Sequence, residues 1–244
     1  MTDKKSFTAE LTRVFGANGM GRLLSMEKSE RFYLLTERML EENEKYNLTA
    51  ITDWDKIILN HYADCATLAV RLPKGAKVLA VGCGAGFPTL PIAILREDVQ
   101  ITAIDSTAKR IGYVAETAKL IGLNNVTAIT MRAEEGGLMP DYREKFDVVT
   151  ARAVAAMRIL AELCLPYVKL GGEFIAMKGK NAQFELTEAK KAISLLGGRD
   201  VQMEEITLLG GDEPLTHPLI SVKKKERTPK DYPRPYAKIS KKPL

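Results

Sequence analysis

Three glycines at alternate positions, Gly82, Gly84 and Gly86, most constrain what this chain can fold into. The apolar run from Lys77 to Val81 before them predicts a strand, and the pattern from Thr89 to Arg96 after them predicts a helix. Glycine permits positive φ and brings backbone N–H groups close to a ligand at a helix start, although such turns also join strands to helices without binding anything. The pattern therefore predicts a strand, a glycine turn and a helix of a doubly wound α/β sheet.

The spacing of the glycines and a following acid indicate which ligand the turn binds. A dinucleotide-binding turn, G-x-G-x-x-G, needs glycine where this chain has Phe87, which disfavours a nicotinamide oxidoreductase. The next predicted strand, Val99 to Ile104, ends at Asp105, where a carboxylate can accept hydrogen bonds from both ribose hydroxyls of an adenosine-containing ligand. A glycine turn with a ribose acid favours S-adenosylmethionine (SAM) as the cofactor.

Alternating strands and helices continue to the end of the chain. We expect a doubly wound, Rossmann-like sheet of the class I SAM-dependent methyltransferase type, divided into an N-terminal helical cap (residues 1–72), a SAM-binding methyltransferase domain (73–223) and a basic, proline-containing tail (224–244). The cap contains helical patterns over Ser6 to Tyr46 and from Asp53, a plausible N-cap, to Leu72. Ser106 is expected to cap a helix that ends at Ile121. The remaining predicted strands are Val126 to Met131, Phe146 to Thr150, Glu173 to Met177, Val201 to Leu209 and Leu219 to Lys223, and the last two should pair antiparallel.

Residues after the third and fourth strands complete the predicted site. Ala133 and Glu134 follow the third strand and should lie beside the glycine turn, because loops at strand carboxyl ends converge on the ligand crevice. Arg152 follows the fourth strand and is expected either to form an ion pair or to contact the ligand. His61 and Asp64 share a helix face three residues apart, and we favour a core role for the histidine over a catalytic one.

Charge is distributed unevenly along the chain, whose formal net charge is +5. From Ser221 onward basic residues far outnumber acidic ones, and the preceding part has a slight acidic excess. The candidate RNA-binding residues are Lys178, Lys180, Lys223, Lys224, Lys225, Arg227, Lys230 and Arg234. The four prolines after Val222 predict an extended segment, and composition alone leaves open whether it is a solvated tail or contacts a polyanion.

Cysteine spacing and hydropathy indicate the compartment in which the protein acts and the partners that it lacks. The three cysteines form no Cys-x-x-Cys pair, so we expect reduced thiols and no metal site. No apolar run has the length of a membrane span, and residues 1–7 lack the apolar core of a signal peptide. We therefore expect a cytoplasmic protein without a membrane partner, acting as a monomer.

The residues after the fourth strand also limit the methyl acceptor. Enzymes that methylate exocyclic amines place Asp or Asn with Pro-Pro-aromatic there, whereas this chain has Thr150-Ala-Arg-Ala. Methylation at a pyrimidine carbon needs a cysteine nucleophile, and neither Cys83 nor Cys164 is suitably placed. The acceptor should therefore be nucleophilic already, as a ring nitrogen such as guanine N7 is.

Several stretches together resemble the bacterial small-subunit ribosomal RNA guanine-N7 methyltransferase family, also called the glucose-inhibited division protein B family. They are Asn47-Leu-Thr-Ala-Ile-Thr, His61-Tyr-Ala-Asp, Gly82-Cys-Gly-Ala-Gly-Phe-Pro, Asp105-Ser with Lys109-Arg, Arg132-Ala-Glu-Glu, Thr150-Ala-Arg-Ala-Val, Gly171-Gly with Met177-Lys-Gly, and Thr228-Pro-Lys-Asp-Tyr-Pro-Arg. The resemblance implies methyl transfer from SAM to N7 of a guanosine in the decoding-centre loop of 16S rRNA, in the small ribosomal subunit. It also implies SAM contacts from Gly82, Phe87, Ala133, Glu134 and Arg152, with Asp105 at the ribose.

The chain departs from the family pattern at Ala80, where the family has an acid that helps to hold the methionine end of SAM. Cys65 and Thr89 are further departures, and neither predicts loss of function. Loss of a charged hydrogen bond at Ala80 should weaken SAM binding by ~1–3 kcal/mol. The alternative function is therefore an RNA- or ribosome-binding protein with the methyltransferase fold and weak or lost activity.

Overall fold

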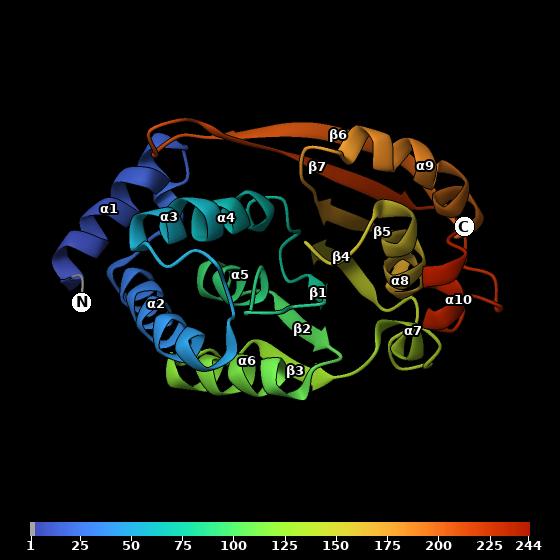
Figure 1. Ribbon diagram of the computed structural model, residues 1–244, viewed down its shortest axis with the longest axis horizontal. Coiled ribbons are helices and arrows are strands. Elements are labelled where there is room, and N and C mark those ends of the chain that lie inside the picture. Colours follow the sequence, from blue (N-terminus) through green and yellow to red (C-terminus); the bar gives the residue numbers. More distant parts are fainter. Residues whose placement is uncertain (1–2) are drawn as a thin grey trace.

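The computed structural model describes residues 3–244; Met1 and Thr2, which begin the predicted cap and the segment tested for a signal peptide, lie outside it. Seven strands form one sheet in the order β3-β2-β1-β4-β5-β7-β6 (Figure 1). The strands are β1 (Lys77–Val81), β2 (Gln100–Asp105), β3 (Val126–Thr130), β4 (Phe146–Arg152), β5 (Val168–Met177), β6 (Gly198–Leu208) and β7 (Leu215–Lys224). The first five pair in parallel, while β7 runs antiparallel to β5 and to β6. The predicted fold class and the antiparallel pairing of the last two strands are confirmed.

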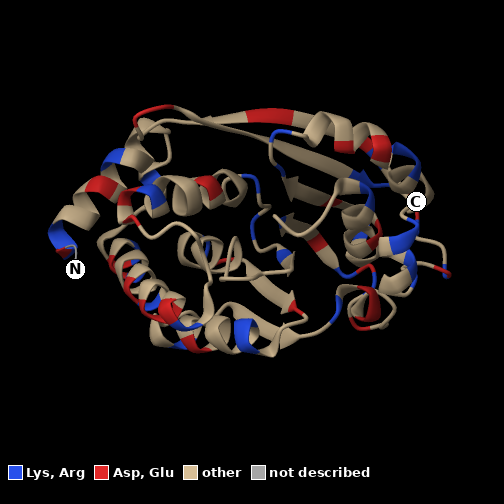
Figure 2. Cartoon of the chain, in the orientation of Figure 1, with Lys and Arg blue, Asp and Glu red and all other residues tan. Residues whose placement is uncertain are grey.

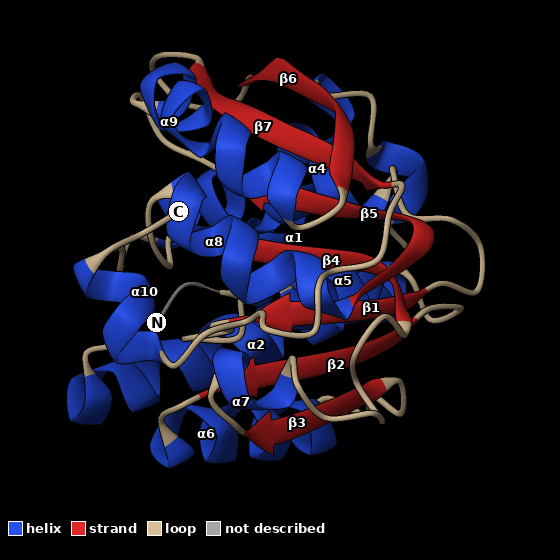
Figure 3. Cartoon of the chain, turned by 90° about the vertical axis from the view of Figure 1, so that its right-hand side faces the viewer, coloured by secondary structure: helices blue, strands red, loops and turns tan. Residues whose placement is uncertain are grey.

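Helices cover both faces of the sheet (Figures 1 and 3). On one side lie α1 (Lys4–Ala17), a short 3₁₀ turn η1 (Gly21–Leu23), α2 (Met26–Tyr46), α3 (Trp54–Ile57), the π-helix η2 (Ile58–Ala63), α4 (Asp64–Ala69), α5 (Thr89–Leu95) and α6 (Ala108–Leu120). On the other lie α7 (Ala133–Gly136), α8 (Met157–Cys164), η3 (Leu165–Tyr167), α9 (Ala182–Leu195) and α10 (Tyr236–Lys241). Alternate strand residues face opposite layers, as the pleat requires: Val78 packs into the first core and Leu79 into the second.

Three local predictions need correction. The helix expected from Ser6 to Tyr46 is interrupted between α1 and α2, where Asn18 ends α1 and Ser25 caps α2. The helix expected up to Leu72 ends at Ala69 and contains the π-helical turn of η2. Thr107, not Ser106, occupies the N-cap position of α6. Within residues 3–244 no helix combines the length and apolar character needed to cross a membrane.

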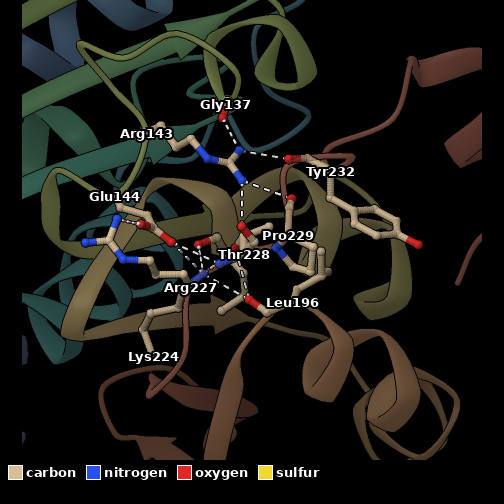
Figure 4. A network of polar contacts seen from close by, with 10 residues as sticks. Gly137, Arg143, Glu144, Leu196, Lys224, Arg227, Thr228, Pro229 and Tyr232 are labelled. Carbon is tan, nitrogen blue, oxygen red and sulfur yellow. Dashed lines mark hydrogen bonds and ion pairs between the residues drawn. The ribbon is translucent and has the colours of Figure 1, made fainter.

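The C-terminal segment is folded against the sheet domain, which contradicts the expected extended conformation and, of the two alternatives left open, the solvated tail. Lys224 is fully buried, and its ammonium donates to Leu165 O and Leu196 O, each at 2.9 Å, and to the Thr228 hydroxyl. Arg143 donates to four backbone carbonyls, at Gly137, Thr228, Pro229 and Tyr232 (Figure 4). Most of these contacts join the segment to residues far away in the sequence, so the composition of the segment could not predict them.

A second anchor holds the segment further on. The guanidinium of Arg234 makes two hydrogen bonds, at 2.8 and 2.7 Å, to the carboxylate of Glu162, whose side chain is fully buried on α8. Ile239 of α10 is also fully buried. Although several prolines precede it, residues 236–241 form a helix, so the expectation that the prolines exclude one is wrong for this part.

Replacing Lys224 with Met should destabilise the fold strongly. Burial lowers the pKa of Lys224 to about 8, so the side chain is still mainly charged at pH 7, and its loss removes one donor from each of two buried carbonyls and a hydroxyl. We expect a loss of about 2–4 kcal/mol in the free energy of unfolding, measured by urea denaturation at pH 7. The matched control is Lys225→Met, because Lys225 is exposed and pairs only with exposed Asp200; it should change stability by less than ~1 kcal/mol. Equal stability of the two variants would contradict the anchoring role.

Candidate cofactor and acceptor site

A cavity of about 510 Å³ opens at the carboxyl ends of the parallel strands. It brings together every residue predicted to bind the cofactor except Gly86, which lies one position from its wall. The lining residues from the predicted set are His61, Gly82, Gly84, Phe87, Asp105, Ala133, Glu134 and Arg152. Leu48, Thr49, Arg110, Met131, Val154, Leu163 and Tyr236 also line it. Loops after β1, β2, β3 and β4 therefore meet where the topology rule for open α/β sheets places a ligand.

The glycine turn holds three positive φ angles, 69° at Gly82, 52° at Gly84 and 85° at Gly86. A Cβ on Gly82 would lie 2.6 Å from Val154, and one on Gly86 would lie 2.6 Å from Leu90, so both glycines are required by packing as well as by φ. A Cβ on Gly84 would meet no atom closer than 4.0 Å. The turn thus leaves open space above Gly84, where a ligand can approach the backbone.

Asp105 ends β2 beside this turn and is 5 % exposed. Its carboxylate accepts the backbone N–H of Gly84 at 3.1 Å and that of Thr107 at 2.9 Å, while Arg110 lies 3.8 Å away. These contacts fix the orientation of the carboxylate and still leave lone pairs for a diol. Asp105 therefore has the geometry expected of a ribose acceptor.

The loop after β3 forms the end of the cavity beyond Asp105. Ala133 and Glu134 begin α7, and the carbonyl of Ala133 accepts the hydroxyl of Tyr167 at 2.6 Å. Glu134 is 9 % exposed and lies 3.7 Å from Arg132. This end of the cavity combines a buried backbone edge and a carboxylate with the apolar side chains of Met131 and Leu163. Such a lining suits a flat heterocycle that carries an amino group.

Arg152 dominates the opposite end of the cavity. Its guanidinium donates to His61 Nδ1 at 2.6 Å, pairs with Asp64 at 3.0 Å and lies 5.4 Å from the centre of the Phe87 ring. The prediction left an ion pair and a ligand contact open for Arg152, and the structure shows the ion pair at the wall of the cavity. The spacing of His61 and Asp64 would allow them to contact each other. In the structure both contact the guanidinium of Arg152 instead.

His61 is oriented by its neighbours and is neutral near pH 7. An arginine only donates, so the contact with Arg152 assigns Nδ1 of His61 as an acceptor and its proton to Nε2, which then donates to Thr49 at 3.2 Å. Nδ1 also lies 3.1 Å from Asn60 O. Burial and then the charge of Arg152 lower the pKa of His61 to about 4. The ring stacks on Phe87 with 4.3 Å between ring centres. These contacts support the core role expected for the histidine.

His217 is the residue of this cluster that sequence reasoning missed. Its Nε2 lies 2.6 Å from Oδ1 of Asp64, although the two residues belong to β7 and α4. A contact between two segments so far apart in the sequence left no local pattern to detect. Tyr236 also reaches the cavity from α10.

The predicted RNA-binding residues divide into engaged and exposed groups. The prediction for Lys224 is wrong, because its ammonium is buried and donates only inward. Lys178 pairs with Glu185 at 2.7 Å and donates to Ala155 O, and Arg234 pairs with Glu162. Lys223 pairs with Glu173 at 3.0 Å while remaining half-exposed. Lys180, Lys225, Arg227 and Lys230 are exposed, although Lys225 pairs with Asp200 at 3.0 Å and Arg227 with Glu144 at 3.4 Å. Figure 2 shows the basic segments around the end of β7 and α10.

Ala80 is buried in the central strand β1, in register with Thr150 of β4. In-register residues of parallel strands face the same side of the sheet, so the two side chains are neighbours. Among residues 3–244 the hydroxyl of Thr150 finds no hydrogen-bond partner, although it is fully buried. An unpaired buried hydroxyl therefore lies next to Ala80.

Solved structures that match this fold include a SAM-dependent methyltransferase and a protein bound to AdoMet. An O-methyltransferase from Thermotoga maritima matches 78 % of this chain and 72 % of its own, with a TM-score of 0.56 and 17 % identity. TYW2 from M. jannaschii, solved in complex with AdoMet, matches 68 % of this chain and 75 % of its own, with a TM-score of 0.52 and 19 % identity. At these identities the likeness establishes the fold alone.

Sequence comparison is more specific. The "Ribosomal RNA small subunit methyltransferase G" of Clostridium perfringens (strain 13 / Type A) is 45 % identical over 229 residues, which are 93 % of this chain and 95 % of that protein. The protein of the same name from Lactobacillus delbrueckii subsp. bulgaricus is 45 % identical over 225 residues, 91 % and 93 % of the two chains. The GidB family, described as "rRNA small subunit methyltransferase G", matches residues 28–210. The chain therefore belongs to the GidB family of small-subunit rRNA methyltransferases.

Proposed function

We propose that this protein transfers the methyl group of SAM to N7 of a guanosine in the 16S rRNA of the small ribosomal subunit. Asp105, oriented by the N–H of Gly84 at the floor of the 510 Å³ cavity, is the observation that carries the proposal. Family membership supports both the rRNA substrate and the enzymatic activity. We expect the protein to act in the cytoplasm, as a monomer.

The residues present fit SAM. Gly84 leaves open backbone for close approach, Asp105 offers its carboxylate to the ribose, and the start of α7 at Ala133 and Glu134 offers a backbone edge and an acid to adenine. Phe87 and Arg152 remain for the methionine end. When bound, SAM supplies an electrophilic methyl group on a sulfonium.

The chain itself contributes position more than proton transfer. His61 accepts a hydrogen bond from Arg152 and has a depressed pKa, and Asp64 is held in an ion pair, so neither is arranged as a free general base. A guanine N7 lone pair needs no deprotonation. Catalysis then rests on alignment of the two substrates and exclusion of water. Phosphate contacts are proposed for the exposed residues Lys180, Lys225, Arg227 and Lys230.

The reaction is tested by incubating the protein with isotope-labelled SAM and small subunits from cells that lack this modification. We expect labelled 7-methylguanosine in the nucleosides of the 16S rRNA, detected by mass spectrometry. A competent enzyme of the family serves as the positive control, and folding of the tested protein is checked separately. Label on another nucleoside, or none, would contradict the proposal.

Replacing Asp105 with Ala should weaken SAM binding by about 10- to 100-fold, because a charge-assisted hydrogen bond to ligand hydroxyls is worth ~1.5–3 kcal/mol. Calorimetry with S-adenosylhomocysteine measures the affinity directly. Asp212→Ala removes an exposed carboxylate in the loop between β6 and β7 and should leave affinity unchanged. Unchanged affinity in Asp105→Ala would remove the ribose role.

The second candidate function, an RNA- or ribosome-binding protein with weak or lost turnover, is favoured by Ala80 beside the unpaired hydroxyl of Thr150. The two functions predict different turnover for the protein as it stands. Strong methyl transfer by the unaltered chain would remove this candidate.

Restoring an acid at this position tests whether Ala80 limits the enzyme. We expect Ala80→Asp to raise affinity for S-adenosylhomocysteine by about 5- to 150-fold, the ratio that corresponds to ~1–3 kcal/mol. Ala80→Asn has nearly the same shape without the charge and should gain much less. Equal affinity of all three proteins would show that Ala80 does not limit binding.

A further inference from the structure

One aromatic side chain in the wall of the cofactor cavity has no part in the contacts proposed above. It is Tyr236, the first residue of α10, which is 41 % exposed. Within residues 3–244 its side chain makes no hydrogen bond and no contact with another ring. The ring is therefore available to a ligand in the cavity.

The path of the chain before Tyr236 shows which part of the wall it belongs to. A Cβ on Gly137, which follows α7, would lie 3.0 Å from Pro233, so Pro233 packs against the end of that helix. Arg234 then pairs with Glu162 on α8. Tyr236 comes two residues later, and α10 lies beside α8 (Figure 1). The C-terminal segment therefore reaches the cavity from the side of α7 and α8.

The same two helices carry the residues at the end of the cavity proposed for adenine. Ala133 and Glu134 begin α7, and Leu163 belongs to α8. All three line the cavity together with Tyr236. Phe87, at the end proposed for methionine, packs instead into the core on the opposite face of the sheet. Tyr236 is therefore on the adenine side of the cavity.

The position of the ring is fixed by contacts on both sides of it in the sequence. Before it, Arg143 donates to three backbone carbonyls of the segment (Figure 4). After it, Ile239 of α10 is fully buried. A ring on an anchored segment has little freedom left to lose when a ligand binds, so less of the contact energy is spent on ordering it.

Adenine offers two ring faces as well as a polar edge. The edge has proposed partners in the backbone of Ala133 and in Glu134, so the faces remain for apolar and aromatic side chains. Aromatic side chains stack on the face of any base and contribute substantially to the affinity for it. An anchored, half-exposed tyrosine ring on this side of the cavity suits a face of adenine.

We propose that Tyr236 stacks on the adenine of SAM, so that the C-terminal segment takes part in cofactor binding. The inference rests on the SAM site of the proposed function and adds a contact to it. Arg143 and Arg234 act as positioning residues, because they hold the segment that carries the ring.

Calorimetry with two ligands tests the contact. S-Adenosylhomocysteine contains adenine, ribose and the amino-acid end, whereas 5′-methylthioadenosine lacks the amino-acid end; weak binding of the latter is measured by displacement. We expect Tyr236→Ala to weaken the binding of both ligands by the same factor, about 5- to 150-fold, the ratio that corresponds to one base–aromatic stack. Tyr236→Phe keeps the ring and should stay within about threefold of the unaltered protein.

Phe184→Ala serves as the control, because Phe184 is an exposed aromatic residue on α9 outside the cavity wall, and it should leave both affinities unchanged. Unchanged affinities in Tyr236→Ala, or an equal loss in Tyr236→Phe, would overturn the stack. A loss confined to S-adenosylhomocysteine would overturn it too, since the contact would then lie at the amino-acid end. Failure of the unaltered protein to bind S-adenosylhomocysteine would overturn the SAM site itself, and so the two failures are distinguishable.

Discussion

The ion pair between Arg152 and Asp64 is the interaction on which the site depends. The guanidinium joins three parts of the chain that are distant in sequence: the π-helix and α4 through His61 and Asp64, the glycine turn through Phe87, and the end of β4. Removing one partner of a buried ion pair leaves an uncompensated charge, which commonly costs ~3–5 kcal/mol. The N-terminal helices are therefore part of the wall of the site as well as a covering layer.

The π-helical turn of η2 contributes to this arrangement. It immediately precedes Asp64 and contains His61, and both residues reach one guanidinium from the same short segment. The hydrogen bonds of a π-turn span one residue more than those of an α-helix, which changes the direction of the side chains that follow it. Such turns are uncommon and occur often at functional sites, and this one lies against the cavity.

Local sequence patterns were enough to predict the strands and loops that form the cofactor cavity. β1 has the predicted bounds, Lys77–Val81, because a short apolar strand before a glycine turn is encoded within a dozen residues. The convergence of Gly84, Asp105, Ala133 and Arg152 on one cavity followed from the topology rule alone.

In contrast, the partners of Lys224 and of Asp64 are set by tertiary contacts, which leave no local pattern. One signal was present for Lys224: Ile220, Val222 and Lys224 alternate along β7 and all three are buried, so strand periodicity indicated an inward lysine where composition indicated only charge.

Arg152 lies beside one anion, Asp64, and one neutral imidazole, His61, and the charge of the cofactor explains this pairing. A cationic sulfonium close to an unpaired guanidinium would be repelled, and a protonated His61 would add to the repulsion. Asp64 offsets the charge of Arg152, and the depressed pKa of His61 keeps its ring neutral, so the cofactor side of the guanidinium presents aromatic and neutral surface. Asp64 therefore keeps the end of the cavity at Arg152 compatible with a cationic ligand.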